Sequence, residues 1–358
     1  MDAGHITGAR LGVIAGVLGA VIAVVLGLVT LGVQATAAPH GLPLAVAVPE
    51  GQAGQALAPV VGRLRQQGGE AVSWRAATPQ QAAELLDDKE IYGILELTPP
   101  APGARFAPTA VVSGALNPAG TQAAQQVLVT AGQALGDAVA GQVPGATAGP
   151  VTVRTVHPTS TAAKTLPLAA SALMWLATLA ASAVVVAVSM RGGRKPSTAT
   201  RLTAAATATV LAPSVVLGFA WLWDSGIPVP WSAVGFLVLV AAAFALLQGG
   251  VLRLLGLPGI AVLAPLYLMA PAVAALPAEL LQPAYKAALW SWTPFRFSTE
   301  TLRSLLFLDG SAPDVSTGIV VFASIAVVGL AVLLWPARKK GDDGAPVAAQ
   351  SSPRVAVG

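Results

Sequence analysis

The chain has 358 residues, of which 55% are hydrophobic and only 10% are charged. Because soluble domains carry about 25% charged residues, this composition indicates a membrane protein. The formal net charge is +4, but the basic residues form no stripe and no aromatic platform accompanies them, which argues against nucleic-acid binding. The chain has no cysteine, which excludes disulfides and thiolate metal sites.

The first predicted element is an apolar run after a short polar N-terminus, residues 1–10, which we expect on the cytoplasmic side. Leu11–Val33 is long enough to cross a bilayer, which needs about 20 residues. It is either a signal anchor, the first transmembrane helix, or a signal peptide cleaved near the small-x-small sequence Ala35-Thr36-Ala37. The run exceeds the roughly 7–15 residues of a signal-peptide core, which favours the anchor.

Residues 34–165 are the largest stretch outside the apolar runs, and we expect them to form a small extracytoplasmic α/β domain. Strand-like runs cover Leu44–Val48, Glu70–Arg75, Ile91–Leu97, Thr109–Ser113 and Val151–His157. Helical patterns cover Gln55–Gln67, Pro79–Asp87 and Pro118–Val143. Strands that alternate with helices are typical of α/β folds. The Pro- and Gly-rich pieces 99–108 and 144–150 are predicted loops.

Residues 166–336 are predicted to form a block of five transmembrane helices. The expected spans are Leu166–Met190, Leu202–Trp223, Ser232–Leu255, Gly259–Leu276 and Thr317–Trp335. The segment 277–316 is too polar to span and is expected outside, with a helix over Ser298–Leu308 lying at the bilayer interface. Residues 337–358 are expected to be a disordered cytoplasmic tail.

The orientation follows from basic residues in the short connections. The connection Met190–Arg201 carries four of them: Arg191, Arg194, Lys195 and Arg201. Because Lys and Arg in short loops stay on the cytoplasmic side, this loop is predicted to face the cell interior. Six spans then place both chain ends inside.

The sequence contains no recognisable catalytic, cofactor or metal motif. HExxH, GxSxG and metal-ligand spacings are absent. The acidic patch Glu84, Asp87, Asp88 and Glu90 lacks the spacing of a calcium loop and is predicted to be a solvated helix end. The spans lack ionisable residues away from their ends, unlike most ion-coupled carriers. The chain has no phosphate-binding GxxxxGK[ST] loop, so any energy from ATP must come from a separate subunit.

Several segments occur in an order that resembles the membrane subunits of ABC-2-type exporters and the related YhgE/Pip membrane proteins. They are Leu44–Glu50, Trp74-Arg75, Ala82–Leu86, Tyr92–Leu97, Asn117 with the following long helix, Thr293-Pro294-Phe295, Glu300–Arg303 and Asp309-Gly310. The resemblance covers most of the chain. It implies a permease subunit that is paired as a homodimer or heterodimer and energised by a separate ATP-binding subunit. The Ala-, Gly- and Val-rich composition suggests a bacterial source, so the plasma membrane is the expected location.

The chain departs from this resemblance on its cytoplasmic side, where the connections are too short for coupling helices. Arg191, Arg194, Lys195 and Arg201 are therefore either the contact with an ATPase or a topology signal alone. The second functional hypothesis is a non-transporting YhgE/Pip-like protein whose outer domain binds a surface or secretion partner. Because no reactive constellation is visible, we expect no enzyme.

Overall fold

The computed structural model describes residues 8–98, 105–142, 147–308, 310 and 312–336. Six of its helices are long and apolar enough to cross a membrane, which is the architecture of a polytopic helical membrane protein. They are α1 (Gly8–Ala35), α5 (Thr161–Arg191), α6 (Thr198–Trp223), α7 (Trp231–Leu255), α8 (Ile260–Ala274) together with the 3₁₀ turn η1 (Leu257–Gly259) that precedes it, and α11 (Asp314–Leu334). The predicted tail, 337–358, and most of the predicted N-terminal segment lie outside the described residues.

Serine caps fix the starts of α5 and α6. The Ser160 hydroxyl accepts a hydrogen bond from the Ala163 amide (3.0 Å), and the Ser197 hydroxyl accepts one from the Thr200 amide (3.1 Å). Each cap satisfies an N–H group that the first helical turn leaves free. Only residues 192–197 separate the two helices, so α5 and α6 form a tight antiparallel hairpin.

Helices α5, α6, α7, α8 and α11, with a shorter helix α10 (Pro294–Phe307), form one helical block around a shared apolar core. Aromatic rings from separate helices meet in its centre. The Trp175 ring lies 4.9 Å from the Phe244 ring, edge to face, and Phe244 lies 5.5 Å from Phe322. Edge-to-face contacts of this kind add about 0.5–1.5 kcal/mol beyond the burial of area.

A glycine brings the backbones of α7 and α11 together. A Cβ atom at Gly329 would lie 2.6 Å from the Leu246 carbonyl carbon and 2.7 Å from the Leu247 nitrogen. Small residues permit such close approach between membrane helices, where van der Waals packing is a main source of association.

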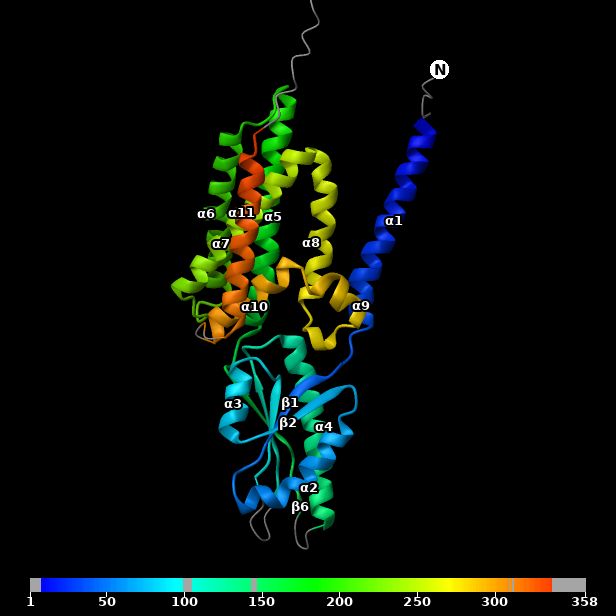
Figure 1. Cartoon of the computed structure of the whole chain (residues 1–358), viewed down its shortest axis with the longest axis vertical. Helices are drawn as coiled ribbons and strands as arrows, with labels where there is room; N and C mark the ends of the chain where they lie inside the picture. Colours follow the sequence, from blue (N-terminus) through cyan, green and yellow to red (C-terminus); the bar gives the residue numbers. More distant parts are fainter. Residues whose placement is uncertain (1–7, 99–104, 143–146, 309, 311, 337–358) are drawn as a thin grey trace, which may run out of the picture.

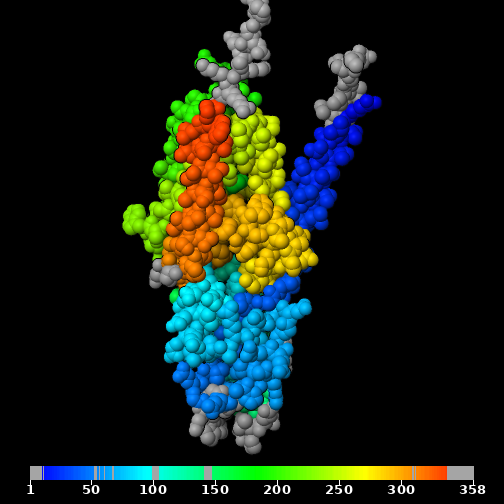
Figure 2. All heavy atoms as spheres, in the orientation of Figure 1, coloured from blue at the N-terminus to red at the C-terminus, as the bar shows by residue number. Residues whose placement is uncertain are grey.

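Helix α1 stands apart from the helical block over most of its length (Figures 1 and 2). Only its last turns are held, with Val29 and Val33 buried against Val273 and Leu276. The Tyr285 hydroxyl also donates to the Leu28 carbonyl oxygen (2.7 Å). Towards the N-terminus, side chains such as Val13 and Leu18 are exposed on all sides.

A five-stranded mixed sheet lies between α1 and α5 in sequence and at one end of the helices in space (Figure 1). The strand order is β2-β1-β3-β5-β7, and only the β3–β5 pair is antiparallel. The strands are β1 (Leu42–Ala47), β2 (Val72–Ala77), β3 (Gly93–Glu96), β5 (Thr109–Ser113) and β7 (Thr152–Val156). We call residues 42–156 the sheet region.

Helices cover both faces of the sheet. Because strand side chains alternate in direction, Leu42, Leu44 and Val46 of β1 face α2 (Gln52–Gln67) and α4 (Pro118–Gln142). Ala45 and Ala47 face α3 (Pro79–Asp87) on the other side. Thr78 caps α3 by a reciprocal pair of hydrogen bonds with Gln81.

The structure adds a short parallel pair of strands, β4 (Arg105–Phe106) and β6 (Thr147–Ala148), within the two stretches predicted as loops. Two-residue strands give no periodic signal in the sequence. The ends of the predicted elements also shift; for example, α5 begins five residues before the predicted start of its span, at its serine cap.

The segment between α8 and α11 differs from its predicted form. It contains the 3₁₀ turn η2 (Ala278–Leu280), the short helix α9 (Pro283–Tyr285), the π-helical turn η3 (Lys286–Trp290) and α10. The sequence predicts that the segment 277–316 is interfacial, with a helix lying on the bilayer surface. The structure instead encloses α10 in protein, because its polar side chains find partners within the chain: Ser298, Arg303 and Ser304 are buried.

Candidate functional site

The sheet region rests on the helical block through a set of charged and polar side chains that we call the junction cluster. It consists of Lys89, Tyr92 and Asn117 from the sheet region, Glu279 from the turn η2, and Glu300, Arg303 and Asp314 from the helical block. The contact is continuous in the space-filling view, where the segment after α8 lies directly on the sheet region (Figure 2).

Lys89 reaches from the turn after α3 into the helical block. Its Nζ donates to Asp314 Oδ2 (2.9 Å) and to the Glu300 carbonyl oxygen (3.2 Å), and it lies 3.6 Å from Glu300 Oε2. Its φ of 62° is in the left-handed region, where a non-glycine residue costs about 1–3 kcal/mol. The contacts across the junction hold this conformation.

Glu300 is the centre of the cluster. Its Oε1 accepts from Arg303 Nη1 (2.6 Å) and from Asn117 Nδ2 (3.4 Å). Burial by itself would raise the pKa of Glu300, but the nearby positive charges of Arg303 and Lys89 outweigh it and hold the pKa below its ordinary value. Glu300 is therefore ionised at neutral pH, and Arg303, only 3% exposed, balances its charge.

A second contact joins Tyr92 to Glu279. The tyrosine hydroxyl donates to Glu279 Oε2 (3.2 Å). Burial, and then the neighbouring Glu279 carboxylate, raise the pKa of Tyr92 well above its ordinary value. The hydroxyl therefore stays protonated and remains a donor. Backbone bonds add to this contact, since the amides of Ala38 and His40 donate to the carbonyl oxygens of Leu280 (3.2 Å) and Glu279 (2.7 Å).

A hollow of about 260 Å³ lies beside the cluster, lined by apolar and charged residues of both parts, among them Lys89, Tyr92, Glu279 and Asp314. Arg296 also lines it, with its guanidinium 3.9 Å from the ring centres of both Trp290 and Phe297. Burial lowers the pKa of Arg296. Cation–π contacts of this kind hold an arginine in place at about 0.5–2 kcal/mol each.

The arrangement can couple the two parts mechanically. Two carboxylates of the helical block, Glu300 and Asp314, share one lysine of the sheet region, so a movement that separates the two parts here would break both ion pairs. Among the described residues, no group of three or more His, Asp or Glu side chains is arranged to hold a metal ion.

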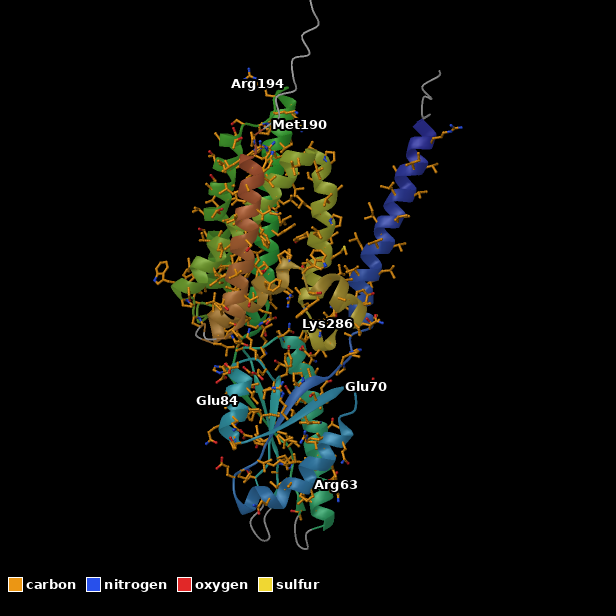
Figure 3. All side chains as sticks on the ribbon, in the orientation of Figure 1. Arg63, Glu70, Glu84, Met190, Arg194 and Lys286 are labelled. Carbon is orange, nitrogen blue, oxygen red and sulfur yellow. The ribbon has the colours of Figure 1, made fainter. Side chains whose placement is uncertain are left out.

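The basic residues predicted as a site lie at the opposite end of the molecule. Figure 3 shows Met190 and Arg194 at the end of the helices away from the sheet region. Arg191 ends α5, Arg194 and Lys195 follow in the connection, and Arg201 lies in the first turn of α6. We call this the basic end. The side chains of Arg191, Arg194 and Lys195 are exposed, and none of the four basic residues makes an ion pair in the part of the chain that the structure describes.

The sequence analysis missed the junction cluster. Lys89 and Asp314 are 225 positions apart, so no local spacing connects them. The one available signal is the polarity of the segment 277–316 beside long apolar runs. The residues of the acidic patch, in contrast, contact separate partners on the surface: Glu90 pairs with Arg75 (2.6 Å) and Asp87 with His157 (3.1 Å).

Acid is expected to weaken the junction. Because the folded-state pKa of Glu300 is depressed, its ionised form contributes stability that is complete above the unfolded pKa of about 4.3 and is lost as the pH falls through the folded value. Thermal unfolding of the purified protein should show this loss below about pH 4. The Glu300→Gln variant should be less stable at pH 7 and should lose less stability on acidification; equal acid sensitivity of both proteins would contradict the assignment.

Comparison with models of protein families, with curated proteins and with solved structures finds no match for this chain.

Proposed function

We propose that this chain is the membrane-spanning subunit of an ABC-2-type exporter in a bacterial plasma membrane, energised by a separate ATP-binding subunit. The observation that carries the proposal is the chemistry of the six spans. In the described residues their interiors hold no Asp, Glu, Lys, Arg or His, so no side chain is placed to couple transport to an ion gradient. A permease with spans of this kind would draw its energy from ATP hydrolysis by the separate subunit.

The distribution of charge supports an orientation with the sheet region outside the cell. Among the described residues, the helix ends on the same side as the basic end add Arg10, at the start of α1, and Arg253, in the last turn of α7, and no acidic residue. All acidic residues of the described chain lie in the sheet region or at the end of the helices that faces it. By the preference of basic residues for the cytoplasm, the basic end is inside and the sheet region forms an extracytoplasmic α/β domain.

The basic end is the surface that an ATP-binding subunit would contact. The connection between α5 and α6 is only residues 192–197, so it offers exposed cations and no inserted helix. Arg191, Arg194, Lys195 and Arg201 would bind an acidic patch on the ATPase. Helix α1 supports a paired permease, because a Cβ atom built at Gly12 or Gly16 would meet no atom of another part of the described chain within 4 Å, which leaves room for a second helix.

Purification from native membranes tests the proposal. We expect an ATP-hydrolysing subunit to remain bound to the detergent-solubilised chain. Exchanging Arg194 and Lys195 for glutamine should reduce the recovered ATPase activity, whereas the same exchange at Arg65 and Arg105, two exposed arginines of the sheet region, should not. Residues Arg10, Arg191, Arg201 and Arg253 keep the topology signal in the first variant.

The shortness of the cytoplasmic connections favours one alternative, a non-transporting YhgE/Pip-like protein whose outer domain binds a surface or secretion partner. The same purification separates the two functions. Recovery of the chain without any ATPase, with its cellular role intact when ATP-binding subunits are deleted, would overturn the exporter proposal and support the alternative.

A further inference from the structure

The sheet region also contains an apolar groove that shares no lining residue with the hollow beside the junction cluster. It is a groove of about 580 Å³ between α2 and α4, with β2 as its floor. Val72 and Trp74 form the floor, Leu64 lines the α2 wall, and Ala131 and Ala134 line the α4 wall. Ligand sites in proteins are typically hollows of about 300–1,000 Å³ with mostly apolar walls and few polar groups.

The walls of the groove are shaped by small residues. A Cβ atom at Gly68, in the turn after α2, would lie 2.5 Å from the Val72 carbonyl oxygen and 2.9 Å from the Trp74 ring. The turn after α2 therefore packs tightly against β2 at this end of the groove. Along α4 the lining runs from Gln126 to Val139, a rise of about 20 Å, so the groove is long and narrow.

The charged lining of the groove is positive only. Arg63 is the single charged residue among those that line its described part, and no carboxylate lies there to neutralise it. Figure 3 places Arg63 towards the end of the sheet region remote from the helical block, with Glu70 nearer to the block. A ligand with an anionic head at Arg63 would extend its apolar part towards the membrane.

We propose that the groove binds a single-chain anionic amphiphile, with its head on Arg63 and its chain along Trp74 and α4. The inference rests on the proposed function and names its substrate class: an anionic lipid-like molecule received on the outer domain as it leaves the bilayer. Each CH₂ group transferred from water into such a groove contributes about 0.8 kcal/mol, so an apolar chain supplies the affinity and Arg63 supplies the preference for charge.

Binding is measured on the full chain in phosphatidylcholine nanodiscs, with dansylaminoundecanoate as a fluorescent anionic amphiphile and empty nanodiscs as background. We expect saturable binding by one molecule per chain. Ala134→Trp fills the groove and should weaken binding by about tenfold or more. The control Gln125→Trp places the same ring on an exposed position of α4 that does not line the groove and should have no effect.

The charge preference has its own matched pair of variants. Arg63→Gln should weaken binding of the anionic probe by about fivefold, as expected for a partly exposed ion pair, without changing binding of its neutral methyl ester. Arg65→Gln removes the same charge from a neighbouring exposed position outside the groove and should change neither. Unsaturable binding, equal effects of the two tryptophans, or no effect of Arg63→Gln would overturn the proposal. Since no ATPase takes part, this failure is distinct from failure of the exporter proposal.

Discussion

Replacing Arg303 with leucine is expected to destabilise the protein by about 3 kcal/mol or more, because the change removes the buried cation that lies 2.6 Å from Glu300. The carboxylate would remain partly buried, with only Lys89 and Asn117 as partners. Thermal unfolding of the purified protein at neutral pH measures this loss.

The molecule offers a matched control for this variant. Arg154 and Glu96 also form an arginine–glutamate pair at 2.5 Å, but on the surface of the sheet region, with 53% and 32% of their side chains exposed. Exposed pairs contribute about 0–1 kcal/mol, so Arg154→Leu should change little. A double variant, Arg303→Leu with Glu300→Leu, should recover part of the loss, because an apolar pair can replace a buried ion pair at little cost. Similar losses for Arg303→Leu and Arg154→Leu would contradict the assigned role of the cluster.

The second large effect is expected inside the helical block, from Gly329→Leu. The new side chain would meet the backbone of α7 at Leu246 and Leu247, and a backbone cannot rotate away as a side chain can. Overpacking costs about 1–3 kcal/mol in cores that can adjust, so we expect a loss at the upper end of this range. The apparent Tm in detergent should fall by several degrees.

Gly218→Leu is the control for this second prediction. Gly218 also lies within a membrane helix, α6, but no atom lies within 4 Å of its built Cβ. The added leucine would face lipid and should leave the apparent Tm almost unchanged. A Gly329→Leu protein as stable as the wild type would show that α7 and α11 are not in backbone contact.

The helices were the most predictable part of the fold, because each apolar run carries its own signal. The sheet strands were also located closely: the strand predicted at Thr109–Ser113 has those bounds in the structure. Strand order, in contrast, depends on contacts between distant segments. Nothing near β7 in the sequence indicates that it pairs in parallel with β5 at the edge of the sheet.

The junction cluster could not be predicted from the sequence, because it too depends on contacts between distant segments. The amphipathic pattern of α10 correctly separates Leu302 and Leu305 from Glu300, but it does not say whether the polar side meets water or protein. In the structure the polar side of α10 meets protein, where Lys89, Asn117 and Asp314 contact it. The four predicted basic residues lie close together at one end of the helices, because they belong to one short connection. Their proposed role in binding an ATPase stays a prediction.

The attachment of α1 by its last turns alone has a consequence for how the helix would lie in a bilayer. Because only the turns around Val29 and Val33 are held, the angle of the rest of the helix depends on hydrocarbon thickness. A thinner membrane tilts an over-long apolar helix and a thicker one straightens it. In a bilayer, we therefore expect the angle between α1 and α8 to change with hydrocarbon thickness, while the contacts around Val29 and Val33 stay in place.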